Sequence, residues 1–174
     1  MNKSLLRSLI VIALVAVVLL AATFGLQSLA VKNARAEHLR IMRTLLPGST
    51  DFVVEPYTGE DANIRSVHKA DEGFVIETAT QGYADEIIVL VGVDNDGTVT
   101  GISILKHAET PGLGAIAGAA SNVGIEWRSQ FQNIPSAAVT KDGGQINPIS
   151  GATITSRAVC NGVTAAQNAV KTVG

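Results

Sequence analysis

The chain has 174 residues and a formal net charge of −2 at pH 7, with 47% hydrophobic and 4% aromatic residues. This length accommodates one domain of ordinary size. A charge so close to zero, without aromatic residues interleaved in a basic cluster, excludes a nucleic-acid-binding surface. The single cysteine, Cys160, excludes an internal disulfide bond. The sequence also lacks the Cys/His cluster that a zinc or iron–sulfur site needs.

The N-terminal region contains an apolar segment, residues 8–31, that carries no charged residue. A stretch of about 20 apolar residues crosses a bilayer, whereas the apolar part of a cleaved signal peptide is shorter. We therefore expect a retained transmembrane helix after a short cytoplasmic segment, residues 1–7, although Ala34-Arg35-Ala36 resembles a cleavage site. More Lys and Arg residues follow the span than precede it, which by the positive-inside rule points the following domain toward the cytoplasm.

Residues 32–50 are expected to form a juxtamembrane helix and a linker. Helix-forming residues run from Ala34 to Leu46, and Pro47-Gly48 is a stop for the helix. The remaining residues, 51–174, are expected to form the folded domain.

Three segments of that domain are rich in β-forming residues: 73–80, 86–93 and 98–105. The sequence Asp94-Asn95-Asp96-Gly97 joins the second to the third, so these two are predicted to pair as an antiparallel hairpin, with the aspartates serving the turn rather than a calcium ion. The second segment is apolar almost throughout, which is typical of a strand covered on both faces.

Two helices are predicted after the hairpin. Residues 115–122 are rich in small side chains and are expected to be helical. From Thr155 onward, apolar residues recur at helical spacing at Val159, Val163, Ala166 and Val170. The polar residues of this amphipathic helix are expected to face water: Asn161, Gln167, Asn168 and Lys171. The predicted fold class is α+β: an N-terminal transmembrane helix, then a domain with an antiparallel sheet packed by helices.

A hydroxyl-rich stretch, SGATITS at residues 150–156, comes immediately before the C-terminal helix. The first N–H groups of a helix are unpaired and lie at the positive end of its dipole, so phosphate binds there readily. Arg157 in the first turn opposes that dipole unless an anion compensates its charge. Taken alone, the stretch favours simple capping of the helix by a hydroxyl over phosphate binding.

A second loop, HAETPGLG at residues 107–114, directly follows the predicted hairpin. In this order along the chain, VGVDNDG, ETPGLG and SGATITS resemble the motifs of the FMN-binding domain family. With a single N-terminal span, the layout resembles that of the G subunits of Rnf electron-transport complexes. The resemblance covers residues 73–170 and identifies 51–174 as an FMN-binding domain.

The resemblance implies that FMN is joined covalently, through its phosphate, to Thr153. A separate magnesium-dependent flavin transferase, acting outside the cytoplasm, would cleave FAD and release AMP. No residue is expected to be catalytic and no metal is expected. The other implied cofactor-binding residues lie in the two loops: Ser150, Gly151, Ala152, Thr155 and Ser156 around the acceptor, and Glu109, Thr110, Pro111, Gly112, Leu113 and Gly114 against the isoalloxazine ring.

One position departs from the family pattern. Family members usually carry an acid six residues before the modified threonine, where this chain has Asn147. Asparagine keeps the size of the side chain and one acceptor but loses the charge. If the acid helps the transferase, modification is expected to be slower in this chain.

The implied function is that of a covalent-FMN electron carrier in a membrane Rnf complex, which moves electrons between ferredoxin and NAD and couples this to Na⁺ or H⁺ translocation. Its expected partners are the flavin-carrying and integral membrane subunits and, during maturation, the flavin transferase. As a redox component of the complex, it needs no substrate-converting site. The resemblance places the FMN domain on the extracytoplasmic side of the cell membrane, against the charge count, because the transferase must reach Thr153.

Three alternatives stay open at this point. The related C subunit of the sodium-pumping NADH:quinone reductase shares both motifs but is usually longer. A stand-alone membrane flavoprotein could pass electrons to extracellular acceptors. In a non-redox alternative, the chain is a membrane-anchored accessory module whose hydroxyl-rich stretch only caps a helix.

The other notable side chains are explained more simply by structure than by chemistry. His107 and Glu109 lack a third metal ligand in the sequence nearby, so hydrogen bonding is preferred. Cys160 is interpreted as a small buried residue. Trp127 and Phe131 lie four residues apart and are predicted to pack in the core or under a neighbouring subunit.

Overall fold

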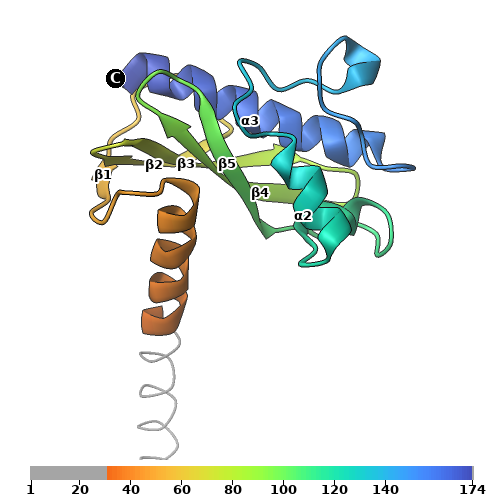
Figure 1. Cartoon of the computed structure of the whole chain (residues 1–174), viewed down its shortest axis with the longest axis horizontal. Coiled ribbons are helices and arrows are strands. Elements are labelled where there is room, and N and C mark those ends of the chain that lie inside the picture. Colours follow the sequence, from red (N-terminus) through yellow and green to blue (C-terminus); the bar gives the residue numbers. More distant parts are fainter. Residues whose placement is uncertain (1–30, 174) are drawn as a thin grey trace, which may run out of the picture. The chain divides into compact units, whose positions relative to one another are not determined.

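The computed structural model describes residues 31–173 (Figure 1). Apart from Val31, the predicted transmembrane helix at 8–31 lies outside the described residues, as does the predicted segment 1–7. Among the helices of residues 31–173, none has both the length and the apolarity needed to cross a membrane. The chain divides into two compact units, residues 1–40 and 41–174, and the second contains the sheet.

The sheet has five antiparallel strands that lie side by side in chain order. They are β1 (Val53–Glu55), β2 (Ile64–Ala70), β3 (Gly73–Gln81), β4 (Glu86–Asp94) and β5 (Val99–Lys106). The three strands predicted from the sequence are confirmed as β3, β4 and β5. Two strands were not predicted: β1, which has three residues, and β2, in which Val67 is the one buried residue, because neither carries a clear apolar alternation.

The turn between β4 and β5 is the predicted hairpin turn. Asp94 Oδ1 accepts hydrogen bonds from the backbone N–H groups of Asp96 (3.0 Å) and Thr98 (2.8 Å). Gly97 has a φ of 85°, in the left-handed region that this kind of turn requires. The turn role of both aspartates is therefore confirmed.

The two central strands, β3 and β4, are buried along most of their length. On one face, α3 (Thr153–Val173) crosses the sheet and contacts both strands (Figure 1). On the other face, Met42 and Leu45 are buried; they lie in the helical residues 31–45, which end before Pro47 as predicted. A Cβ atom at Gly92 of β4 would lie 2.7 Å from the Leu45 carbonyl oxygen, so glycine allows this close approach. The prediction that the apolar strand is covered on both faces is confirmed.

The C-terminal helix is confirmed and begins at Thr153, two residues earlier than expected. Its predicted core positions are all buried: Val159, Val163, Ala166 and Val170. Three of the four predicted polar positions are exposed: Asn161, Asn168 and Lys171. The prediction for Gln167 is wrong, because its side chain is buried. Its Nε2 donates hydrogen bonds to three loop carbonyl groups, those of Gly97, Ile134 and Pro135.

The segment after β5 contains two short helices where one was predicted at residues 115–122. The first is the 3₁₀ helix η1 (Gly114–Gly118), and the second is α2 (Asn122–Ser129). Ser121 Oγ accepts a hydrogen bond from the Gly124 N–H (3.4 Å) and so begins a new helix. Trp127 of α2 packs edge-on against Phe131 with ring centroids 5.2 Å apart, and both are buried, which confirms their predicted packing in the core.

Candidate functional site

The loop after β5 and the start of α3 meet around one cavity of about 480 Å³. The two loops singled out in the sequence, about 40 residues apart, therefore form a single site. Eight of the predicted site residues line the cavity: Glu109, Thr110, Leu113, Gly114, Gly151, Ala152, Thr153 and Thr155. Four others do not line it: Pro111, Gly112, Ser150 and Ser156.

The first turn of α3 presents free backbone donors to this cavity. The first intrahelical hydrogen bond runs from the Ser156 N–H to the Ala152 carbonyl oxygen (3.0 Å). The N–H groups of the three preceding residues, Thr153 to Thr155, therefore have no acceptor within the helix. Gly151, two residues before the helix, has a φ of 74° and needs the left-handed freedom of glycine to turn the chain into the helix.

The hydroxyl groups of this stretch do not cap the helix. Ser156 Oγ accepts from the Ile149 N–H (3.0 Å) and donates to the Ala152 carbonyl oxygen (3.0 Å). Ser156 is fully buried, so it fixes the turn before the helix instead of facing the cavity. Within residues 31–173, no hydroxyl of the stretch accepts a hydrogen bond from an N–H of the first helical turn. The capping role that the sequence alone favours is therefore not observed.

Glu109 ties together three segments around the cavity. One carboxylate oxygen accepts a hydrogen bond from the Ala84 N–H (3.0 Å), and the other accepts from the Thr155 hydroxyl (2.5 Å). The Glu109 side chain is only 5% exposed. Hydrogen bonds to a carboxylate are stronger than neutral ones, so this buried group joins the β3–β4 turn, the loop after β5 and the start of α3.

Two glycines make room for this carboxylate. A Cβ atom at Gly82 would lie 2.5 Å from one Glu109 oxygen, and a Cβ atom at Gly114 would lie 2.6 Å from the other. The second glycine belongs to the ETPGLG motif. Its role is therefore steric: it lets the loop close over Glu109 and Thr155.

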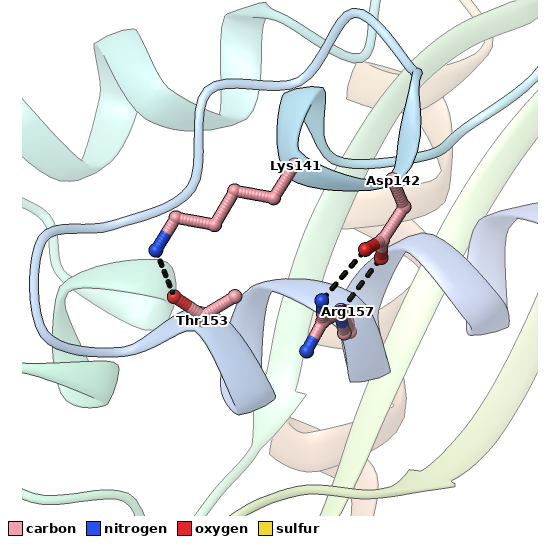
Figure 2. A network of polar contacts seen from close by, with 4 residues as sticks. All are labelled: Lys141, Asp142, Thr153 and Arg157. Atoms are coloured by element: carbon pink, nitrogen blue, oxygen red, sulfur yellow. Dashed lines mark hydrogen bonds and ion pairs between the residues drawn. The ribbon is translucent and has the colours of Figure 1, made fainter.

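A lysine from a third loop reaches the predicted FMN acceptor. Lys141 lies in the 3₁₀ helix η2 (Thr140–Asp142), and its Nζ donates a hydrogen bond to Thr153 Oγ1 over 3.2 Å (Figure 2). The next residue, Asp142, forms a two-pronged ion pair with Arg157 of α3, at 2.7 Å to Nε and 2.6 Å to an Nη atom. The short helix η2 is thus attached to α3 at two points one helical turn apart.

The ion pair also changes the interpretation of Arg157. In the sequence its charge suggested a phosphate at the helix start, but the anion that compensates it is Asp142. The hydrogen bond from Arg157 lowers the pKa of Asp142, and the same pair raises the pKa of Arg157. A lowered carboxyl pKa means that the ion pair persists at neutral and mildly acidic pH and is lost only as the pH falls through that value, below the ordinary Asp pKa of about 3.9.

Three cavity residues were missed by the sequence analysis: Tyr83, Lys141 and Ile154. Tyr83 is 68% exposed, Ile154 is 52% exposed and Leu113 is 42% exposed, so three large apolar side chains surround the cavity in contact with water. An apolar residue inside a hydroxyl-rich stretch was the available sign for Ile154. Tyr83 and Lys141 belong to turns distant in sequence, and only the fold brings them to the site.

The described residues contain no group of three or more His, Cys, Asp or Glu side chains that could hold a metal ion. His107 Nδ1 instead accepts a hydrogen bond from the Glu109 N–H over 3.3 Å. The predicted hydrogen bonding is confirmed for His107 and Glu109. Asn147 is exposed and does not line the cavity. Its backbone is fixed from α2, since its carbonyl oxygen accepts from Trp127 Nε1 over 2.9 Å.

Cys160 is buried in α3, and burial raises its pKa to about 12. Because the thiolate is the reactive form, we expect the native protein to resist iodoacetamide at pH 8. Unfolding in urea should make the thiol react at the rate of a free cysteine. Rapid stoichiometric alkylation of the native protein, followed by mass spectrometry, would contradict the burial of this residue.

Comparison with known proteins gives one family. The model of the FMN-binding domain matches residues 82–168, a range that includes every residue lining the cavity. A protein of Methanosarcina acetivorans, named as the G subunit of an ion-translocating oxidoreductase complex, is 37% identical over 167 residues, covering 87% of this chain and 85% of that protein. A protein of the same name from Stutzerimonas stutzeri is 31% identical over 171 residues, covering 88% of this chain and 74% of its own length.

A third relative covers a shorter part. The G subunit of the Na(+)-translocating ferredoxin:NAD(+) oxidoreductase complex of Acetobacterium woodii is 44% identical over 94 residues, covering 52% of this chain and 45% of that protein. The family match and the two long alignments agree with each other and with the motifs around the cavity. The chain therefore belongs to the FMN-binding domain family, and its long relatives are G subunits of ion-translocating oxidoreductase complexes.

Proposed function

We propose that this chain is the FMN-carrying G subunit of a membrane Rnf complex and that the FMN is bound covalently to Thr153. The observation that carries the proposal is the cavity in which the ETPGLG loop meets the SGAT segment at the start of α3. Family membership supports FMN as the ligand, and the names of the relatives support the complex.

The residues around the cavity fit the two ends of FMN. Its volume of about 480 Å³ lies in the range of ordinary ligand pockets, about 300 to 1,000 Å³. The start of α3 offers unpaired N–H groups and the Thr153 hydroxyl to a phosphate. The exposed apolar side chains of Tyr83, Leu113 and Ile154 offer a surface to the isoalloxazine ring.

The chain's own part in attachment is that of an acceptor. The Thr153 oxygen would form a bond to the FMN phosphorus of FAD while the bond between the two phosphates breaks, AMP leaves, and the hydroxyl proton passes to the flavin transferase. This phosphoester does not touch the isoalloxazine ring, so the ring keeps its redox chemistry. Glu109 would hold the ETPGLG loop against α3, and Tyr83 would shield one side of the ring from water.

Once bound, FMN supplies reversible electron transfer, and the protein positions it and sets its environment. By extension from the Acetobacterium woodii relative, the complex would transfer electrons between ferredoxin and NAD with translocation of Na⁺ or H⁺. The proposed partners are the other flavin-carrying and integral membrane subunits. A covalent link would prevent loss of FMN on the extracytoplasmic side, where we place residues 51–174 behind the transmembrane segment 8–31.

The competing accessory-module function needs the hydroxyl-rich stretch to act as a helix cap. The hydrogen bonds of Thr155 and Ser156 are directed to Glu109, Ile149 and Ala152 instead, which favours a binding site over a cap. The cavity does not distinguish a stand-alone flavoprotein from a subunit of a complex, because these two differ in their partner proteins.

The test is to purify the full chain from membranes of cells that contain a flavin transferase and to record its visible spectrum before and after acid precipitation. We expect one flavin per chain to stay with the precipitated protein. In the native protein, before precipitation, dithionite should reduce this flavin and air should reoxidise it. Co-purifying membrane subunits would support the Rnf complex over a stand-alone carrier. A colourless protein would refute the redox function and leave the accessory module.

A further inference from the structure

We propose that Lys141 is the cation that binds the FMN phosphate at Thr153, and that the Asp142–Arg157 ion pair is the device that positions it. This inference rests on the proposed function. It names a phosphate-binding residue outside both sequence motifs, on a loop that contributes no other residue to the cavity lining.

The charges around the cavity favour Lys141 as the residue that binds the phosphate. Among the described residues that line the cavity, Lys141 is the one cation and Glu109 is the one anion. Glu109 already accepts hydrogen bonds from Ala84 and Thr155 and is 5% exposed. Arg157, the other cation near the helix start, is paired with Asp142. Lys141 is therefore the cationic group left to face an anion at Thr153.

The position of the Lys141 ammonium group also fits this role. Lys141 Nζ lies 3.2 Å from Thr153 Oγ1, the atom that would carry the phosphorus (Figure 2). A phosphate oxygen bonded to the same phosphorus would fall within reach of the same ammonium group. Lysine binds phosphate as a mobile point charge, so it can follow the oxygen from the free hydroxyl to the phosphoester.

The loop that carries Lys141 is fixed in place. Residues 138–146 are closed on themselves by backbone hydrogen bonds, including those from the Thr140 N–H to Ile146 and from the Gly144 N–H to Val139. The two-pronged contact from Asp142 then ties this closed loop to α3. Thr153 and Arg157 lie four residues apart and so share one face of the helix. The adjacent residues Lys141 and Asp142 contact that face at Thr153 and at Arg157.

The contact also has a consequence for attachment. The ammonium donates to Thr153 Oγ1, so the hydroxyl does not need to use its own proton for that hydrogen bond. The proton stays available for removal by the transferase. Once the phosphoester has formed in place of the hydroxyl group, Lys141 would neutralise its single negative charge.

The experiment compares the full chain with four variants: Lys141→Gln, Lys141→Arg, Asp142→Asn and, as a matched control, Lys171→Gln at an exposed position of α3. Each is incubated with FAD, Mg²⁺ and a flavin transferase, and the modified fraction is followed by intact mass. We expect Lys141→Gln to slow modification about fivefold or more, as for loss of a charged hydrogen bond at a solvent-accessible site. The Lys141→Arg variant should keep most of the parent rate of modification. Asp142→Asn should be modified at a rate between those of the parent and Lys141→Gln, and Lys171→Gln should match the parent.

A second readout separates charge from structure. The phosphorus-31 NMR signal of the attached FMN should shift in Lys141→Gln and stay near the parent position in Lys171→Gln, while the unfolding temperatures of both stay unchanged because both lysines are exposed. A parent chain that is modified at Thr153, with Lys141→Gln matching it in rate and phosphorus signal, would overturn this inference alone. A parent chain that stays unmodified would overturn the proposed function and this inference with it.

Discussion

Replacing Thr153 by alanine should abolish covalent FMN completely, because the phosphoester has no other oxygen at that point of the chain. Thr153 is the cavity residue whose hydroxyl meets Lys141, whereas in the same helical turn Thr155 donates to Glu109 and Ser156 is fully buried. We expect all flavin to appear in the supernatant after acid precipitation. The protein should still fold, since Thr153 has no other hydrogen bond from its side chain among residues 31–173.

The matched variant is Thr153→Ser, which keeps the hydroxyl and removes one methyl group. It should be modified, though more slowly, because serine samples more side-chain rotamers than threonine. Flavin that stays with the Thr153→Ala protein through acid precipitation would place the bond on another residue. That result would contradict the assignment of the acceptor without contradicting FMN binding.

Replacing Glu109 by alanine should destabilise the domain by about 2 to 3 kcal/mol, the cost of leaving charged hydrogen bonds unmade at a buried site. The change leaves the Ala84 N–H and the buried Thr155 hydroxyl without their acceptor. It also frees the ETPGLG loop from the start of α3. We expect the unfolding temperature of the full chain in detergent to fall by about 5 °C or more. The fluorescence of Trp127, the single tryptophan, reports this unfolding.

Glu109→Gln is the control variant that keeps the shape of the side chain and removes its negative charge. The amide oxygen can still accept from Ala84, and the amide nitrogen can donate to the Thr155 oxygen, so most of the stability should be retained. Flavin attachment should fall in Glu109→Ala and be largely preserved in Glu109→Gln. An alanine variant as stable and as fully modified as the parent would show that this carboxylate does not hold the site together.

The central fold is readable from the sequence because its strands are strongly patterned. β4 is apolar almost throughout, and the Asp94–Gly97 turn fixes its pairing with β5, so the hairpin is a local feature. The helix α3 repeats apolar residues at helical spacing. By contrast, β1 has three residues and β2 carries mostly polar side chains; β2 forms a strand because β3 offers it a paired edge, and β1 pairs with β2 in turn. Such pairing is a tertiary effect that local patterns do not contain.

The site could be predicted only in part, because some of its residues lie in local motifs and others reach it through tertiary packing. Both loops come from motifs that are contiguous in sequence, and the fold brings them to one cavity as expected. Tyr83 lies in the turn between β3 and β4 and Lys141 in the short helix η2, and both reach the cavity through tertiary packing. Arg157 shows how a correct local argument can point to the wrong partner: the compensating anion exists, but it is Asp142, 15 residues earlier in the chain.

The most direct test of covalent FMN attachment is the intact mass of the protein purified from its native membrane, followed by fragmentation around Thr153. We expect the mass of the chain plus one FMN less one water, with the added mass on Thr153. This result would also show that a chain with Asn147 six residues before Thr153 is competent for attachment. An unmodified mass, in protein that carries no flavin, would contradict the proposal that this chain is an FMN carrier.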